Sequence, residues 1–145
     1  MAVDNTTESV PAAPDYDEIV RVIQLYIDGF NESDINKFRE AFHEDARMTF
    51  TDAEGELHSA RLSDCFEEWS QRWEGVPGDE FVLRVLSVTQ AGDVGCVVLE
   101  MYEPNNLSNS WVDIHSLLRV DGKWTDMNKT ATHSSRADWA GAHAP

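Results

Sequence analysis

The amino-acid sequence predicts an α+β fold, in which three helices from the N-terminal half cover one face of a curved antiparallel β-sheet. Apolar residues recur at helical spacing near the start of the chain, and β-rich segments separated by turn signals dominate after residue 80. A sheet with one apolar face needs a cover on that face, and the helices can supply it. With 145 residues, 41% of them hydrophobic, the chain suits one domain with a single core.

The first helix is expected to begin at Asp15, because Glu18 lies three residues further on and completes a capping-box pattern. Residues 31–34 break the helical periodicity, and a short second helix is expected to run to about His43. The apolar face of the first helix consists of Tyr16, Ile19, Val20, Ile23, Tyr26, Ile27 and Phe30.

A third helix is expected to begin at a cap formed by Ser63 or Asp64 and to end near Gly75. It carries an aromatic stripe of Cys65, Phe66, Trp69 and Trp73. The Asp121-Gly122 pair is a strong type I′ turn signal, so the last two strands should form a hairpin. Strands are expected at residues 47–52, 56–61, 81–89, 94–102, 111–120 and 123–133.

One domain is expected over residues 14–134, between a disordered tail of residues 1–13 and a loose tail of residues 135–145. The chain has 27 acidic and 11 basic residues, and its net charge of -16 repels phosphate backbones and anionic lipid headgroups. No apolar run approaches the roughly 18 residues of a membrane span. Nucleic acid and membranes are therefore not expected partners.

The two cysteines, Cys65 and Cys96, lie in apolar segments without metal-binding spacing, so we expect free thiols in a reducing compartment. The first residues have neither a basic start nor an apolar run, which argues against a secretory signal and favours a cytoplasmic location. The sequence has no dinucleotide, P-loop or metal-ligand motif, so neither a cofactor nor a metal is expected.

Two phrases of the sequence carry a resemblance to a known superfamily. They are FHEDA at residues 42–46 and WVDIHSLLRVDGKW at residues 111–124. Together with the order of elements, they resemble the nuclear transport factor 2-like superfamily, and within it the lumazine-binding and SnoaL-like groups, over about residues 15–133. The resemblance implies a cone, with the sheet wrapped around the helices and a pocket between them. It does not choose a chemistry, because relatives include ketosteroid isomerase, polyketide cyclases, dehydratases and binding modules without catalysis.

The last hairpin has one polar face and one apolar face if its turn has two residues, and His115 then pairs with Asn128. Periodicity alone puts the apolar face in the core, whereas the resemblance implies that the polar face lines the cone. We follow the resemblance, so the apolar face should lie outside, where a homodimer interface would cover it. That outer face contains Val112, Ile114, Leu118 and Met127.

His115 is the candidate general acid/base, with Asp113 and Asp126 as neighbouring carboxylates that fix its tautomer and stabilise its charged form. The resemblance supports this choice, because the position of His115 is similar to that of the catalytic aspartate in SnoaL-like cyclases. The alternative is that His115, Asp126 and Asn128 belong to a solvated sheet face.

Aromatic side chains on the helices and strands could bind a flat apolar ligand, although such stripes also occur as plain core. Asp52 and His58 lie near a turn, where exposure is the better expectation. The substrate-binding candidates are Tyr26, Phe30, Phe50, Phe66, Trp69, Trp73, Trp111 and Asn128.

Two functions remain open from the sequence. The first is a cofactor-independent isomerase, dehydratase or cyclase that acts on a small apolar or aromatic carbonyl or hydroxyl compound by general acid/base catalysis. The second is a non-catalytic ligand-binding or dimerisation module of the same fold.

Overall fold

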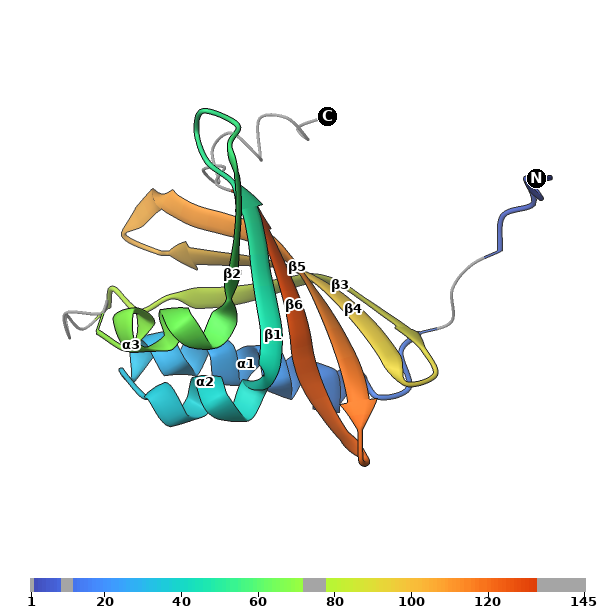
Figure 1. The fold of residues 1–145 in the computed structure, drawn as a ribbon, viewed down its shortest axis with the longest axis horizontal. Helices are drawn as coiled ribbons and strands as arrows, with labels where there is room; N and C mark the ends of the chain where they lie inside the picture. The colour runs from blue at the N-terminus through green and yellow to red at the C-terminus, as the bar shows by residue number, and fades with distance from the viewer. Residues whose placement is uncertain (1, 9–11, 72–77, 133–145) are drawn as a thin grey trace.

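The computed structural model describes residues 2–8, 12–71 and 78–132 and confirms the α+β class. Figure 1 shows the helices gathered on one side of a strongly curved sheet. The helical elements are α1 (Tyr16–Asn31), α2 (Ile35–Ala41), a 3-10 turn (Leu62–Cys65) and α3 (Phe66–Trp69). The strands are β1 (Phe42–Thr51), β2 (Leu57–Arg61), β3 (Val82–Ala91), β4 (Val94–Glu103), β5 (Asn106–Val120) and β6 (Lys123–Thr132).

The strands lie in the order β2-β1-β6-β5-β4-β3. Neighbouring strands are antiparallel except β1 and β6, which run parallel, so the expectation of a purely antiparallel sheet is wrong at this pair. After β2, at one edge of the sheet, the chain crosses to the opposite edge with β3. It then returns strand by strand through β4 and β5, so that β6 lies beside β1 and runs in the same direction. The parallel pairing places Met48 of β1 beside Lys129 of β6.

The start of α1 is fixed by contacts with the sheet and not by a capping box. Asp15 makes no side-chain cap hydrogen bond. Its carboxylate instead accepts hydrogen bonds from Arg119 Nη1 at 2.6 Å and from Trp124 Nε1 at 3.0 Å. The predicted helix start is therefore right, but its cause lies in residues of the last hairpin.

The second helix is shorter than expected, because Phe42 already begins β1. Asp34 caps the helix by accepting a hydrogen bond from the backbone N–H of Asn36 at 2.9 Å. The two helices approach closely at Gly29, where an added Cβ would lie only 2.5 Å from the Phe38 ring. A side chain at Gly29 would therefore push the helices apart.

The core lies between the helices and the inner face of the sheet, and it is mostly aromatic around α1 and α2. Tyr26 and Phe38 are completely buried, and their rings contact each other and those of Phe30, Phe42 and Trp69. Aromatic rings of this size bury much apolar area and prefer such edge-on or tilted contacts. This packing forms the wall against which the polar residues of β5 and β6 lie.

The predicted hairpin turn is present, since Asp121 and Gly122 both have positive φ angles, as a type I′ turn requires. The predicted pairing beyond it is only partly right. A register shift between Ser116 and Leu117 pairs His115 with Lys129, and not with Asn128. Because one extra residue in a strand reverses which side chains face inward, Lys129 replaces Asn128 on the inner face.

The apolar face of the last hairpin lies outside, as expected. Ile114 is 47% exposed and Leu118 38% exposed, whereas Asp113, His115 and Asp126 are completely buried. The part of the predicted polar face that carries Asp113, His115 and Asp126 therefore points into the core, which periodicity alone would not have predicted.

The N-terminal end of the described chain has no regular secondary structure. Residues 2–8 contain no helix or strand and are exposed, while the predicted tail of residues 135–145 lies outside the described residues. Cys96 is a free cysteine. None of the helices in the described ranges has the length and apolar character needed to cross a membrane.

Candidate functional site

A cluster of four ionisable side chains lies on the inner face of β5 and β6. Asp113 and His115 come from alternate positions of β5, and Asp126 and Lys129 come from β6 on either side of the register shift. Asp113, His115 and Asp126 have no exposed surface, and Lys129 is 8% exposed. The sequence thus builds a charged cluster in the core, which requires that the charges compensate one another.

The four side chains form a continuous chain of contacts. His115 Nδ1 and Asp126 Oδ2 share a hydrogen bond of 2.5 Å. On the other side of the ring, His115 Nε2 lies 3.6 Å from Asp113 Oδ2, and that oxygen lies 3.7 Å from Lys129 Nζ. Two cations and two carboxylates therefore alternate, and their charges sum to zero when all four are ionised.

The surroundings shift the pKa values of the cluster in different directions. Burial alone lowers the pKa of His115, but the charges of Asp126 and Asp113 and the hydrogen bonds to them outweigh burial and raise it to about 9. Burial raises the pKa of Asp126. Burial acts the same way on Asp113, yet the Lys129 cation and His115 outweigh it and keep the pKa of Asp113 below its usual value. A pKa of about 9 favours the protonated form of His115 at neutral pH, the form that Asp113 and Asp126 stabilise.

Lys129 is held at the end of the cluster by two aromatic faces. Its Nζ lies 4.7 Å from the centroid of the Trp69 ring and 5.1 Å from that of the Tyr26 ring. Both are cation–π contacts, in which the face of an aromatic ring attracts a cation. The Tyr26 ring also lies 5.2 Å from the His115 ring, so it covers the inner part of the cluster.

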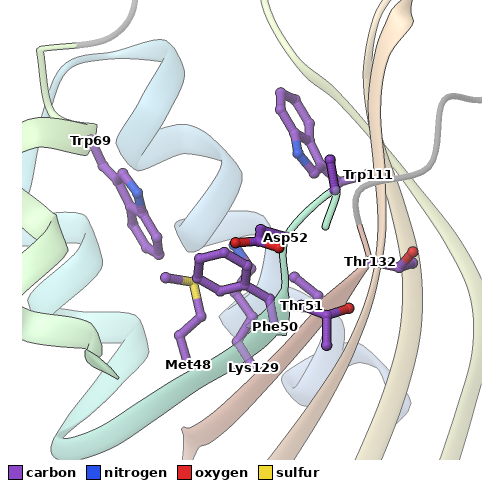
Figure 2. Close-up of a pocket in the computed structure, with 10 residues that line it drawn as sticks. Met48, Phe50, Thr51, Asp52, Trp69, Trp111, Lys129 and Thr132 are labelled. Carbon is purple, nitrogen blue, oxygen red and sulfur yellow. The ribbon is translucent and has the colours of Figure 1, made fainter. Parts of the chain in front are cut away.

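A cavity of about 340 Å³ opens beside Lys129. Trp69 from α3 and Trp111 from β5 lie on opposite sides of it in Figure 2, with Phe50, Asp52 and Lys129 between them. Its size suits a small molecule, and its walls are mainly apolar with few polar groups. The lining residues are Met48, Phe50, Thr51, Asp52, Ala53, Trp69, Trp111, Lys129, Ala131 and Thr132.

Lys129 is the member of the buried cluster that also lines the cavity. His115, Asp113 and Asp126 lie behind it and do not line the cavity wall. A ligand in this cavity would therefore meet the Lys129 ammonium, while the other three residues would act on the ligand through Lys129.

A second Asp–His pair lies at the rim, with Asp52 in the turn after β1 and His58 in β2. Asp52 Oδ2 and His58 Nε2 are 2.8 Å apart, and Asp52 Oδ1 accepts hydrogen bonds from the backbone N–H groups of Glu54 and Glu56. The bond with His58, followed by the backbone bond from Glu56, lowers the pKa of Asp52. The sequence favoured exposure for both residues, but Asp52 lines the cavity and only His58 is exposed.

The structure divides the predicted binding residues into three groups. Phe50, Trp69 and Trp111 line the cavity. Tyr26, Phe30 and Phe66 are core residues that do not reach the cavity wall, because their helical faces pack against the sheet. Asn128 is exposed on the outer face as a result of the register shift, and Trp73 lies outside the described residues.

Sequence reasoning missed Lys129 as a site residue. Its position on the predicted apolar face hid it, and the only sequence signal was that a lysine is out of place on such a face. The same register error hid Ala131, which also lines the cavity.

Within the described ranges, the only three potential metal-ligand side chains that lie within 4.8 Å of one another are Asp52, Glu56 and His58. Both oxygens of Asp52 already accept hydrogen bonds from this turn. The arrangement is therefore explained without an ion.

The fold is the one seen in nuclear transport factor 2-like proteins, as solved structures of similar shape show. An NTF2-like protein from Shewanella baltica superposes with a TM-score of 0.72 at 21% identity, over 86% of this chain and 97% of its own. An NTF-2-like protein from Silicibacter pomeroyi gives a TM-score of 0.67 at 17% identity, over 81% and 93% of the two chains. A domain with a cystatin-like fold from Nostoc punctiforme gives 0.66 at 16% identity, over 91% and 85%.

Within this class, residues 14–131 match the family described as "Putative lumazine-binding", and the chain belongs to that family. The chain is also similar to a protein named Aldolase FrzH from Cladobotryum sp., with 22% identity over 115 residues. The match covers 79% of this chain and 88% of that protein. Family and fold together indicate a protein of a small-molecule-binding or enzyme-like type.

Proposed function

We propose that this protein is a cofactor-independent enzyme of the isomerase, dehydratase or cyclase kind. Its substrate is a small, flat, apolar or aromatic molecule with a carbonyl or hydroxyl group, and its reaction is a proton transfer at a carbon next to that group. The observation that carries the proposal is the buried chain from Asp126 through His115 and Asp113 to Lys129, which ends in an aromatic cavity of about 340 Å³.

The four residues of the buried cluster are suited to stabilising a substrate oxygen that gains negative charge. Removing a proton next to a carbonyl creates an enolate, and a fixed cation in a cavity of low dielectric constant stabilises the charge better than water does. Lys129 has a position suited to this task, because rings on two sides and Asp113 on a third restrain its ammonium group. Asp113, His115 and Asp126 act as positioning residues, since they hold Lys129 in place and keep the buried charges balanced.

The aromatic walls account for the expected shape of the substrate. Trp69, Trp111 and Phe50 offer ring faces and edges to a flat molecule. The relative named an aldolase agrees with this class of reaction, because an aldol addition also passes through the enolate of a carbonyl compound.

The experiment is hydrogen–deuterium exchange of aromatic ketones in D2O, followed by NMR, with indanone and tetralone as probes. The wild-type protein should accelerate exchange at the carbon next to the carbonyl. Lys129→Met should reduce the rate about a hundredfold, as removal of an oxyanion-stabilising group does. Lys123→Met removes an exposed lysine from the same strand and should leave the rate unchanged.

The alternative function is a non-catalytic ligand-binding module, and one observation favours it. Three of the four cluster residues have no surface on the cavity, so the cluster could serve folding alone. In that case the ketones would perturb the NMR signals of Trp69 and Trp111, but wild type would give no exchange above the rate of Lys129→Met.

The outer face of the sheet supports a homodimer as part of the proposal. Four apolar side chains there are 38–49% exposed on neighbouring strands, namely Val94, Ile114, Leu118 and Val120. Exposed apolar side chains gathered on one face of a sheet are typical of an interface between identical subunits. Sedimentation should give twice the monomer mass, and Ile114→Asp should give the monomer; a monomeric wild type would contradict the dimer.

We also propose a cytoplasmic location. Cys96 is a free cysteine, which fits a compartment that keeps thiols reduced. Fractionation of cells that express the tagged protein would test this.

A further inference from the structure

We propose that Asp52 is the general base of the cavity and that His58 is its positioning partner and its outlet for protons to solvent. This inference rests on the proposed proton-transfer function and adds the group that receives the proton. The C–H bond of the substrate breaks, its electron pair moves into the conjugated system towards the oxygen near Lys129, and the proton passes to a carboxylate oxygen of Asp52.

The first argument is the inventory of ionisable groups on the cavity wall. Among the ten lining residues, only Asp52 and Lys129 carry ionisable side chains. Asp113, His115 and Asp126 have no exposed surface and do not line the cavity. Within the described residues, the carboxylate available to a ligand is therefore that of Asp52.

The second argument is the number of acceptor positions that Asp52 has left. A carboxylate offers about four lone-pair sites. Oδ1 accepts from the backbone N–H groups of Glu54 and Glu56 at 3.0 and 2.9 Å, and Oδ2 shares one hydrogen bond of 2.8 Å with His58. In the described structure one site on Oδ2 is thus left for a substrate proton, and the Asp52 side chain is 27% exposed beside the cavity.

The third argument is the environment of His58. Its ring stacks on Phe50, with centroids 5.0 Å apart and an angle of 10°, and Phe50 itself lines the cavity. The side chain of His58 is 46% exposed. A proton that reaches Asp52 can therefore pass to the His58 ring, because that ring contacts Asp52 on one side and water on the other.

The fourth argument is the spacing of the base and the cation. Met48 pairs with Lys129 across the parallel strands, and Asp52 lies four residues after Met48, just past the end of β1. That offset is about 13 Å along the strand, and the long lysine side chain spans part of it. A flat, conjugated ligand of about two rings can contact both groups, so that negative charge formed at one end reaches the other.

The test uses nitrobenzisoxazole, a flat aromatic C–H acid that is independent of the natural substrate. A base removes its C–H proton, the N–O bond breaks, and the electron pair forms a nitrile while a coloured phenoxide is released. Wild-type protein should catalyse this elimination, and Asp52→Asn should lower kcat/KM by at least about a hundredfold. Asp45→Asn removes an exposed carboxylate from β1, the strand that precedes Asp52, and should match wild type.

His58→Gln gives a readout that a purely structural role would not. The groups around Asp52 are His58 from β2, Lys129 across the cavity, and the backbone of the turn that carries Glu54 and Glu56. Loss of the His58 hydrogen bond should move the acid limb of the pH–rate profile to higher pH, because that bond is the main reason why the pKa of Asp52 is lowered.

The outcomes separate this inference from the proposed function. Equal elimination rates for wild type and folded Asp52→Asn, checked by circular dichroism, would overturn the role of Asp52. So would ketone exchange that persists in Asp52→Asn, although the proposed function would then stand. Elimination that requires Asp52, without ketone exchange by wild type, would support the base and overturn the proposed function.

Discussion

The protein contains two Asp–His pairs whose side chains are the same and whose surroundings are opposite. His115 and Asp126 share a hydrogen bond of 2.5 Å with no exposed surface. His58 and Asp52 share one of 2.8 Å with side chains that are 46% and 27% exposed. In the buried pair, charges raise the pKa of His115 to about 9, and burial raises that of Asp126. In the rim pair, hydrogen bonds lower the pKa of Asp52.

The difference shows that burial, and not the Asp–His hydrogen bond itself, determines whether the pair stabilises charge or exchanges protons. In the core, the proton on His115 is trapped by carboxylates on both sides, so the pair stabilises charge and exchanges protons with difficulty. At the rim, water screens the charges and the proton can leave. The first pair is therefore suited to holding Lys129, and the second to moving a proton.

The largest expected effect is the loss of stability when the buried pair is broken. Asp126→Asn keeps the shape of the side chain but leaves the charge of His115 partly uncompensated, and we expect a loss of about 3–5 kcal/mol in the free energy of unfolding. Urea unfolding followed by tryptophan fluorescence measures it. Asp52→Asn is the matched change at the rim and should lose far less; equal losses would mean that burial does not distinguish the pairs.

The second effect is a pH dependence of stability that belongs to the buried pair alone. The pKa of His115 is about 9 in the folded protein against an ordinary value of 6.5, so its stabilisation is complete below pH 6.5 and is lost as the pH rises through 9. The total is on the order of 3 kcal/mol. Unfolding free energies at a series of pH values should fall across this window in wild type and stay flatter in His115→Gln.

The groups that face His115 in this experiment are Asp113, Asp126 and Lys129, together with the Tyr26 ring. His58→Gln should keep the wild-type slope, because its ring is largely outside the core. A wild-type curve without a fall between pH 6.5 and 9 would show that His115 is neutral in the fold.

The third effect tests the end of the buried chain. Lys129→Met retains an apolar stem but leaves Asp113 with His115 as its one nearby cation in the described structure, and we expect a loss of about 1–3 kcal/mol at neutral pH. The pKa of Asp113 is lowered in wild type, so its contribution is present above the ordinary value and is lost as the pH falls. Unfolding between pH 7 and 3 should therefore be less sensitive to acid in Lys129→Met than in Lys123→Met.

The fold could be predicted from the sequence because its signals are local. The Asp121-Gly122 turn fixed the hairpin correctly as far as the pairing of Leu117 with Asp126. Beyond that point, the extra residue in β6 needs no glycine or proline to mark it, so the sequence contained no sign of the register shift. That shift alone exchanged Asn128 for Lys129 on the inner face.

The site could be predicted only in part, because its chemistry depends on distances between strands. Periodicity favoured a solvated polar face, and the family resemblance was needed to turn Asp113 and His115 inward. Burial of this face is possible because Lys129 balances the second carboxylate, and that contact was invisible while Lys129 was assigned to the outer face. The position of Asp52 depends on where β1 ends against the parallel strand β6, a pairing the sequence did not predict.

The smallest expected effect is the change in stability caused by His58→Gln, and it tests most directly whether the two Asp–His pairs have different functions. His58→Gln removes an imidazole that is 46% exposed, and the hydrogen bond it loses is one of three that hold Asp52. Exposed pairs contribute little to folding, since water replaces the lost partner. The urea midpoint should therefore stay at the wild-type value, while the pH–rate profile of elimination shifts. A large loss of stability without that shift would mean that the Asp52–His58 pair stabilises the fold and does not transfer protons. The two Asp–His pairs would then differ in burial but not in function.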